Sequence, residues 1–184
     1  MNRIGLAVTG AMLLGAATAA AQGVRYGVGA GLLLPVSDYH SLDKAGWIAG
    51  ADVTYWLASG AIAIRGEGSY SRTGQRQGSC CLTDHTTAIA GGMVDVVYAF
   101  GKTADRIRPY LLAGVGLYNW RLSAPGFTPS SETKVGFGGG AGAAYRVGSG
   151  NTRIFLESKV TSLTVNGVSL VSIPIRVGLR FGAK

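Results

Sequence analysis

The chain has few charged residues and no run of them. Lys, Arg, Asp and Glu make up 14% of its 184 residues, a low share for a soluble secreted domain, whereas hydrophobic residues make up 47%. So much apolar surface needs a cover, and membrane lipid is a candidate. The 17 basic residues outnumber the 9 acidic ones but are dispersed along the chain. Because nucleic-acid-binding proteins concentrate basic residues in patches or runs, we expect no nucleic-acid partner.

Long apolar runs are absent except at the N-terminus. There, a short basic start precedes an apolar run over residues 4–17 and three alanines that end at Ala21. This order is typical of a secretory signal peptide, predicted to cover residues 1–21 and to be cleaved. A membrane anchor is the alternative, but small residues fill the end where an anchor would carry Leu or a basic stop. Residues 22–184 then form one predicted domain with no spanning helix.

The C-terminal segment alternates strictly between apolar and other residues. From Ile173 to Phe181 every odd position is apolar, and the even positions include Arg176 and Arg180. Such alternation predicts a strand with one apolar and one charged face. A soluble barrel buries its apolar face, whereas charge inside and apolar residues outside suit a barrel wall surrounded by lipid.

Alternation of this kind recurs in seven earlier segments. The eight predicted strands cover residues 24–35, 47–57, 61–71, 88–100, 109–121, 135–147, 153–160 and 172–181. Their lengths are close to the roughly 9 to 11 residues that a tilted strand needs to cross a bilayer. The fifth strand is apolar on both faces, and Asn119 and Arg121 suggest that its odd positions point inward.

The connections between these strands alternate in length. Short ones cover residues 58–60, 101–108 and 148–152, and long ones cover residues 36–46, 72–87, 122–134 and 161–171. Bacterial outer-membrane barrels have short periplasmic turns and long extracellular loops. The sequence therefore predicts an all-β, eight-stranded antiparallel up-and-down transmembrane β-barrel in the cell outer membrane.

The predicted inward positions carry charges of both signs. They are Arg25, Asp52, Arg65, Glu67, Asp95, Arg146, Arg153, Glu157, Lys159, Arg176 and Arg180. Because an unpaired charge in a narrow interior is costly, we expect these side chains to form a network of ion pairs. A narrow passage is the alternative, and seven positive groups against four would favour anions in it. An eight-stranded barrel, however, has an interior that side chains just fill.

Four motifs resemble the small outer-membrane β-barrel family, related to the transmembrane domain of outer-membrane protein A and to outer-membrane protein X. They lie at residues 108–118, 137–142, 154–157 and 177–181. The resemblance implies a monomer inserted by the barrel-assembly machinery, which recognises an aromatic-ended last strand, here with Gly178 and Phe181. Three residues follow Phe181 in this chain, whereas many members end on the aromatic residue itself.

Two adjacent cysteines, Cys80 and Cys81, lie at the tip of the longest predicted loop. Outside the cell they are not expected to stay free. A disulfide between neighbours is strained, because the usual Cα separation of about 4.4 to 6.8 Å exceeds the ~3.8 Å of a trans peptide. The alternatives are intermolecular disulfides and the binding of a soft metal ion by the cysteines together with His85. The usual ligand spacing of a metal site is missing, and no cofactor is expected.

The two histidines are each next to an acid and a hydroxyl in predicted loops. The groups are Asp38, His40 and Ser41, and Asp84, His85 and Thr86. These are the elements of a catalytic triad, but neighbours along a chain seldom align as one. We therefore predict no catalytic residues and no enzyme activity.

The favoured function is a small non-enzymatic outer-membrane protein with a largely filled polar interior. It would contribute to envelope integrity and present extracellular loops for interaction or adhesion. Arg72 and Arg76 are suited to the phosphates of lipopolysaccharide, the expected partner together with membrane lipid. A narrow porin-like channel with mild anion preference is the first alternative, and a lipid A-modifying enzyme is the second.

Overall fold

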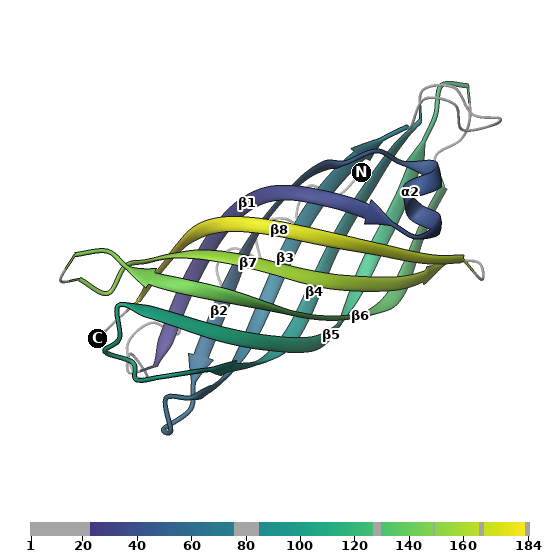
Figure 1. The fold of residues 1–184 in the computed structure, drawn as a ribbon. Coiled ribbons are helices and arrows are strands. Elements are labelled where there is room, and N and C mark those ends of the chain that lie inside the picture. Colours follow the sequence, from purple (N-terminus) through teal and green to yellow (C-terminus); the bar gives the residue numbers. More distant parts are fainter. Residues whose placement is uncertain (1–22, 76–84, 127–129, 149, 166–167, 183–184) are drawn as a thin grey trace, which may run out of the picture.

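The computed structural model describes residues 23–75, 85–126, 130–148, 150–165 and 168–182. Its strands form one closed barrel in chain order, each antiparallel to its neighbours, with β8 closing against β1 (Figure 1). The strands are β1 (Val24–Val36), β2 (Gly46–Trp56), β3 (Ile62–Gly74), β4 (Thr86–Ala99), β5 (Ile107–Ser123), β6 (Ser130–Arg146), β7 (Arg153–Val165) and β8 (Val168–Gly182). The predicted all-β, eight-stranded antiparallel barrel is confirmed.

Several predictions concern residues outside this description. They are the signal peptide at residues 1–21 and the loop residues Arg76, Cys80 and Cys81. Among the described residues, no helix is long and apolar enough to cross a membrane. The short helix α2 (Asp38–Leu42) follows β1.

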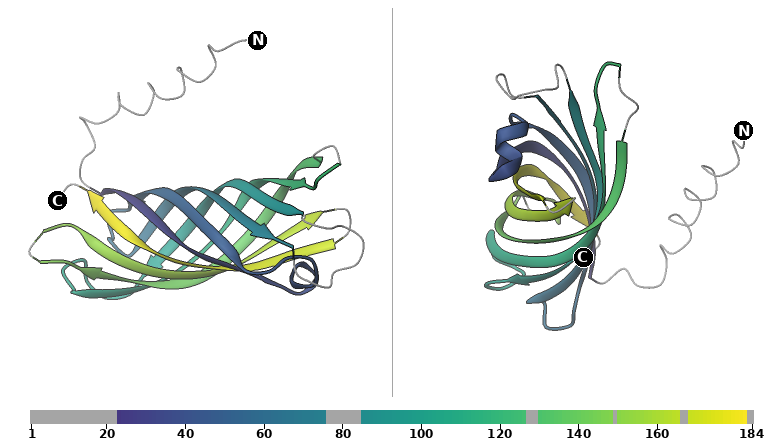
Figure 2. Two further views of the ribbon diagram at one scale, coloured as in Figure 1. Left: turned by 90° about the horizontal axis from the view of Figure 1, so that it is seen from above. Right: turned by 90° about the vertical axis from the view of Figure 1, so that its right-hand side faces the viewer.

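The two ends of the barrel differ. At the turn end, short turns connect β2 to β3, β4 to β5 and β6 to β7, and Gly23 and Gly182 lie at this end. Gly60, in the first of these turns, has φ 65°, a conformation that glycine adopts without strain. At the helix end, α2 follows β1, and the strands slant across the wall between the two ends (Figure 2).

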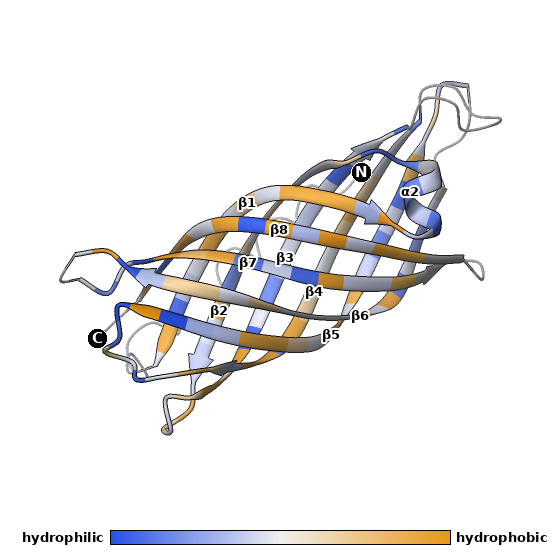
Figure 3. Cartoon of the chain, viewed as in Figure 1, coloured by the Kyte–Doolittle hydropathy of each residue, from blue (hydrophilic) through white to orange (hydrophobic). Residues whose placement is uncertain are grey.

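The outer wall is apolar along the middle of the strands. Val94, Val96 and Phe137 are 57%, 58% and 64% exposed, whereas Arg65 and Asp95 on the inner face are 0% exposed. Figure 3 shows the alternation of hydrophobic and hydrophilic residues along each strand. Contact of this apolar outer surface with water would be unfavourable. The surface therefore indicates a barrel that lies in lipid.

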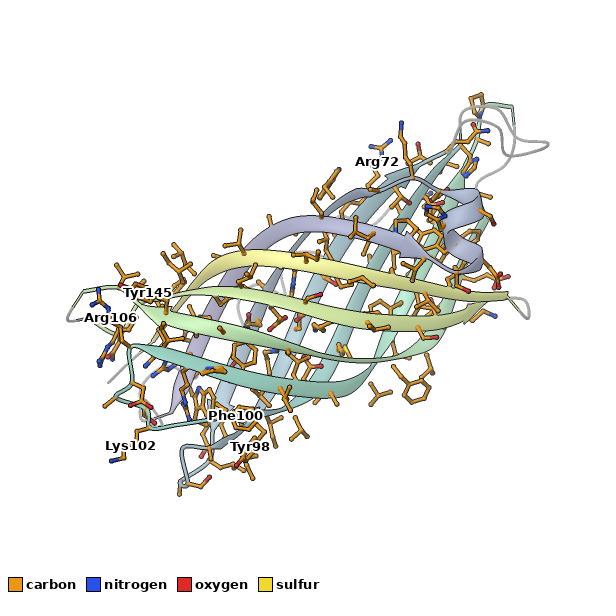
Figure 4. All side chains as sticks on the ribbon, in the orientation of Figure 1. Arg72, Tyr98, Phe100, Lys102, Arg106 and Tyr145 are labelled. Carbon is orange, nitrogen blue, oxygen red and sulfur yellow. The ribbon has the colours of Figure 1, made fainter. Side chains whose placement is uncertain are left out.

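Aromatic residues gather near both ends of the outer wall. Near the turn end, the rings of Tyr98 and Phe100 are 5.1 Å apart, and Arg106 lies over the ring of Tyr145 (Figure 4). Near the helix end, the rings of Trp47 and Tyr70 are 5.6 Å apart. Amphipathic rings at two levels are typical of the two interfaces of a membrane.

The phase predicted for the fifth strand is wrong. In β5 the even positions point inward: Tyr110 and Tyr118 are buried, whereas Asn119 and Arg121 are exposed. On the outer face, Asn119 Nδ2 donates a hydrogen bond to Ser131 Oγ on β6 at 3.0 Å. These polar residues lie near the helix end, beyond the apolar belt, where the outer face need not be apolar. Their polarity therefore says nothing about the lumen.

The last two predicted long loops are mostly strand. Pairing between β5 and β6 continues to Leu122 and Ser130, and pairing between β7 and β8 continues to Val165 and Val168. Hydrogen bonds between the strands satisfy the backbone equally well inside and outside a membrane, so pairing does not stop where the apolar pattern stops. The predicted loop boundaries were therefore wrong.

Candidate functional site

Glu157 lies at the centre of a network of charges inside the barrel. This side chain projects from β7 and is 1% exposed. Its Oε2 accepts hydrogen bonds from Arg65 Nη1 at 2.6 Å and from the Tyr110 hydroxyl at 2.9 Å. Its Oε1 accepts one from Arg176 Nη2 at 2.7 Å, and Arg180 Nη2 lies 3.3 Å from Oε2. One carboxylate thus bridges three guanidinium groups.

Glu67 and Asp95 extend the network toward the helix end. Glu67 Oε2 accepts hydrogen bonds from Lys159 Nζ at 2.8 Å and from Arg176 Nη2 at 2.5 Å. Asp95 Oδ2 accepts from Arg65 Nε at 3.0 Å and Nη2 at 2.7 Å. Lys159 also reaches Asp95 at 3.4 Å. Strands β3, β4, β7 and β8 are joined across the lumen in this way.

Arg180 connects the network to the apolar side chains near the turn end. Its Nε lies 3.2 Å from Asp52 Oδ1, and Thr54 donates to the same oxygen at 3.0 Å. Its Nη1 donates to the Tyr110 hydroxyl at 3.1 Å, and its guanidinium lies 4.3 Å from the centre of the Phe155 ring. Arg180 is therefore held by charge, hydrogen bonds and cation–π contact together.

The strand register sets up two of these ion pairs directly. Arg65 is the cross-strand partner of Asp95, and Glu157 is the cross-strand partner of Arg176. Opposite charges at directly facing positions of a sheet attract one another. Arg65 also lies 3.4 Å from Glu67 on its own strand, and Arg180 lies 3.3 Å from Glu157 on the neighbouring strand. The other pairs of the network join strands that are not neighbours, so they depend on closure of the barrel.

The network is balanced in charge and fills the middle of the barrel. Its cations are Arg65, Lys159, Arg176 and Arg180, and its anions are Asp52, Glu67, Asp95 and Glu157. The cavity between it and the apolar side chains near the helix end has a volume of about 30 Å³. That is room for about one water molecule.

Three arginines predicted for this network lie elsewhere. Arg25, Arg146 and Arg153 lie around a cavity at the turn end. Arg153 Nη2 donates to the carbonyl oxygen of Thr103 at 2.7 Å, and Arg146 donates to that of Ala104. The middle of the lumen therefore lacks the predicted surplus of positive charge, seven positive groups against four negative ones. The surplus arginines lie beyond it, toward the turns.

Near the helix end, α2 is tied to the barrel by a cluster that the sequence did not predict. Asp43 Oδ1 lies 2.7 Å from His85 Nε2, and Thr73 donates to Asp43 Oδ2 at 2.5 Å. The Tyr39 hydroxyl lies 2.8 Å from Thr73 Oγ1, and burial raises the pKa of Tyr39. His85 thus pairs with Asp43 of a distant segment. The hydroxyl of Thr73 bonds to the carboxylate and not to the imidazole, unlike the nucleophile of a catalytic triad.

The comparisons with known proteins identify the family. A family model described as the outer membrane protein beta-barrel domain matches residues 5–181. The chain belongs to this family. The resemblance to small outer-membrane barrels found in the sequence is confirmed. None of the curated proteins compared with the chain matches it.

Solved structures of other outer-membrane barrels share the fold. Neisserial surface protein A has a TM-score of 0.66 at 17% identity, with 87% of this chain and 97% of that chain covered. Ail, the attachment invasion locus protein of Yersinia pestis, has a TM-score of 0.54 at 18% identity, with 86% and 99% covered. A major outer membrane protein from Thermus thermophilus has a TM-score of 0.53 at 13% identity, with 86% and 98% covered. At these identities the likeness shows the fold alone.

The remaining predicted site residues lie on β3 and β8. Arg72 was expected in a loop, but it is an exposed residue of β3 near the helix end (Figure 4). Phe181 points outward and is 45% exposed. A side chain at Gly178 would instead meet Phe155 inside the barrel. The last strand of this family member therefore presents Phe181, and not Gly178, on its outer face.

Sequence reasoning missed two aromatic partners of the network. Tyr110 bonds both Glu157 and Arg180, and the ring of Phe155 supports Arg180. Phe155 is in phase with Arg153 and Glu157, so the alternation of the seventh strand could have placed it inside. Tyr110 was missed because the phase of the fifth strand was inverted.

Proposed function

We propose that the protein is a non-enzymatic structural protein of the outer membrane whose sealed barrel presents the outer ends of its strands at the cell surface. The observation that carries this proposal is the balanced charge network that fills the lumen. We assign the turn end to the periplasm and the helix end to the exterior, because outer-membrane barrels have short periplasmic turns. An aromatic residue near the end of β8, Phe181, is the proposed signal for the barrel-assembly machinery.

The two alternative functions have weaker support. A mildly anion-selective channel needs an open lumen with surplus positive charge, whereas the central network pairs four cations with four anions. A lipid-modifying enzyme needs a hydroxyl activated by a histidine. The Thr73 hydroxyl at the Asp43–His85 pair bonds to the carboxylate.

The outer ends of β5 and β6 support a role in surface contact. These strands have 17 residues each, more than the roughly 9 to 11 needed to cross the bilayer. Asn119, Ser131 and Thr133 form a polar cross-strand cluster on their outer face. Among proteins of this fold, one is named for attachment and invasion and has been crystallised with a heparin analogue. We propose attachment as the use of this surface.

Two arginines near the helix end form a candidate lipopolysaccharide contact. The register places Trp47 beside Arg72, Arg72 beside Ala88, and Ala88 beside Arg121. Arg72 and Arg121 are both exposed on the outer face and lie two strands, or about 10 Å, apart. Trp47 and Tyr70 lie near the proposed membrane interface, and two guanidinium groups at this level support a contact with phosphates of lipopolysaccharide.

The double variant Arg72→Gln/Arg121→Gln is expected to bind lipopolysaccharide at least about tenfold more weakly, because two charge-assisted hydrogen-bonding groups are lost. Binding is measured by calorimetry on barrel refolded in a neutral detergent. Arg106→Gln, near the opposite end of the outer wall, is the matched control and should bind normally. Equal affinity of the double variant and the wild type would refute the contact, as would undiminished binding of dephosphorylated lipopolysaccharide.

A further inference from the structure

The mouth of the lumen at the turn end, which the proposed function assigns to the periplasm, holds a cluster of four arginines. We call Arg25, Arg108, Arg146 and Arg153 the basic vestibule. Arg108 and Arg153 are 4% and 3% exposed. None of the four takes part in an ion pair within the described segments. Asp105 is close, but its Oδ2 accepts a hydrogen bond from the backbone N–H of Lys102 at 2.7 Å.

Turn capping accounts for part of this arrangement. Arg108 donates to the carbonyl oxygen of Gly60, and Arg153 donates to those of Thr103 and Asp105. Carbonyl oxygens accept hydrogen bonds but carry no full negative charge, so Asp105 is the acidic group that offsets part of the charge of Arg108 and Arg153 within the described segments. Arg25 has no side-chain hydrogen bond within the described segments, so capping does not explain its position at the mouth.

The charges of the vestibule repel one another. Arg25 is close enough to Arg108 for repulsion, Arg108 to Arg153, and Arg153 to both Arg25 and Arg146. Asp105 attracts Arg108 and Arg153, but more weakly than the neighbouring arginines repel them. Clustering like charges in a half-buried place is unfavourable unless an anion joins them. The balanced network deeper in the lumen has no carboxylate to spare.

Two buried N–H groups beside the vestibule lack acceptors. Trp56 Nε1 and Arg108 Nε have no hydrogen-bond partner among the described residues. The guanidinium of Arg108 lies 4.4 Å from the centre of the Trp56 ring, so the two groups are adjacent. A buried donor left without an acceptor costs free energy, which an anion with several oxygens would recover.

Three arginines of the vestibule line a cavity of suitable size, and the fourth, Arg108, lies against Trp56 in its wall. Its volume is about 400 Å³, and its lining includes Arg25, Trp56, Arg146, Asn151 and Arg153. These residues come from the ends of β1, β2, β6 and β7 and from one turn, so they converge on the mouth from several sides. The volume lies within the range of small-molecule pockets and exceeds what a bare phosphate ion fills.

We propose that the basic vestibule binds an organic phosphate at the periplasmic mouth of the barrel. Guanidinium forks match the oxygens of phosphate and can bind them in pairs. A phosphate ester presents several acceptor oxygens and up to two negative charges to the converging arginines and the indole N–H. The organic group occupies the rest of the cavity. The phosphate is carried by a soluble ester of the periplasm or by a phospholipid headgroup of the inner leaflet.

The test titrates full-length mature barrel, refolded in a neutral detergent, with glycerol 3-phosphate at low ionic strength. The wild type is expected to bind, and Arg25→Gln to bind at least about tenfold more weakly, because a charged hydrogen-bonding partner is removed. Arg106→Gln is the matched control, since it removes the same charge near the same end but from the outer wall, where Arg106 lies over Tyr145. A heat-modifiability gel verifies that each variant is folded.

A second arm separates the two sources of phosphate. Native mass spectrometry of barrel released from nanodiscs that contain phosphatidylglycerol detects retained lipid. Retention by the wild type but not by Arg25→Gln, without binding of glycerol 3-phosphate, identifies the headgroup. The reverse pattern identifies a soluble ester. Absence of binding in both arms, or equal behaviour of Arg25→Gln and Arg106→Gln, would overturn the proposal.

Discussion

Replacing Glu157 with glutamine lowers the free energy of unfolding by about 3–5 kcal/mol, the range found when one partner of a buried ion pair is removed. Glu157 lies between Arg65, Arg176 and Arg180, and all four side chains are buried. Glutamine keeps the shape but removes the charge, so four cations would face three anions. Urea unfolding of the barrel in lipid vesicles, followed by tryptophan fluorescence, measures the change.

Glu132→Gln is the matched control for this substitution. Glu132 pairs with Lys134 at 3.1 Å on the same strand, and both side chains are about one third exposed. An ion pair so open to solvent contributes about 1 kcal/mol or less. If Glu157→Gln destabilises the barrel no more than Glu132→Gln, the network does not hold the lumen together.

Gly178→Val is expected to destabilise the barrel by about 1–3 kcal/mol or to block refolding, because the added side chain overpacks the interior. A Cβ atom at Gly178 would lie 2.7 Å from Cε1 of Phe155 and would also collide with the carbonyl oxygen of Val28. Displacing the Phe155 ring also removes the support of Arg180. The measurement is refolding and urea unfolding of purified protein without assembly machinery.

Gly68→Val tests the same change of residue where there is space. Gly68 faces outward on β3, and a Cβ atom there meets no other heavy atom within 4 Å. The free energy of unfolding should change by no more than about 0.5 kcal/mol. If Gly178→Val refolds with wild-type stability in vitro but fails to assemble in cells, Gly178 acts in recognition by the machinery and not in packing.

The fold was predictable because hydropathy alternates clearly in the strands other than the fifth, although some inward positions, such as Ile89 and Met93, are also apolar. Arg65, Glu67 and Asp95 alternate with apolar residues that face lipid, and this alternation alone assigns them to the inner face. The fifth strand gave no such signal, since Leu111 and Leu112 differ in environment but not in hydropathy: one faces lipid and the other faces the lumen. A hydropathy pattern cannot distinguish a residue that faces lipid from one that packs in an apolar part of the lumen.

The members of the charge network were easier to predict than its pairs. The alternation of the seventh strand assigned Lys159 to the inner face together with Glu157. Its ion pairs, however, cross the lumen to Glu67 and Asp95. Alternation also assigned Arg25 to the inner face but did not indicate its position along the barrel axis. That position distinguishes the residues of the basic vestibule from those of the balanced network. Pairing across a closed barrel depends on strand tilt and side-chain length, which a linear pattern does not contain.

Single-channel recording of the refolded mature protein in planar bilayers tests the sealed barrel most directly. A sealed lumen gives a flat current trace at either polarity, because ion pairs joining β3, β4, β7 and β8 fill it. Discrete and reproducible conductance steps from protein that a heat-modifiability gel shows to be folded would contradict it.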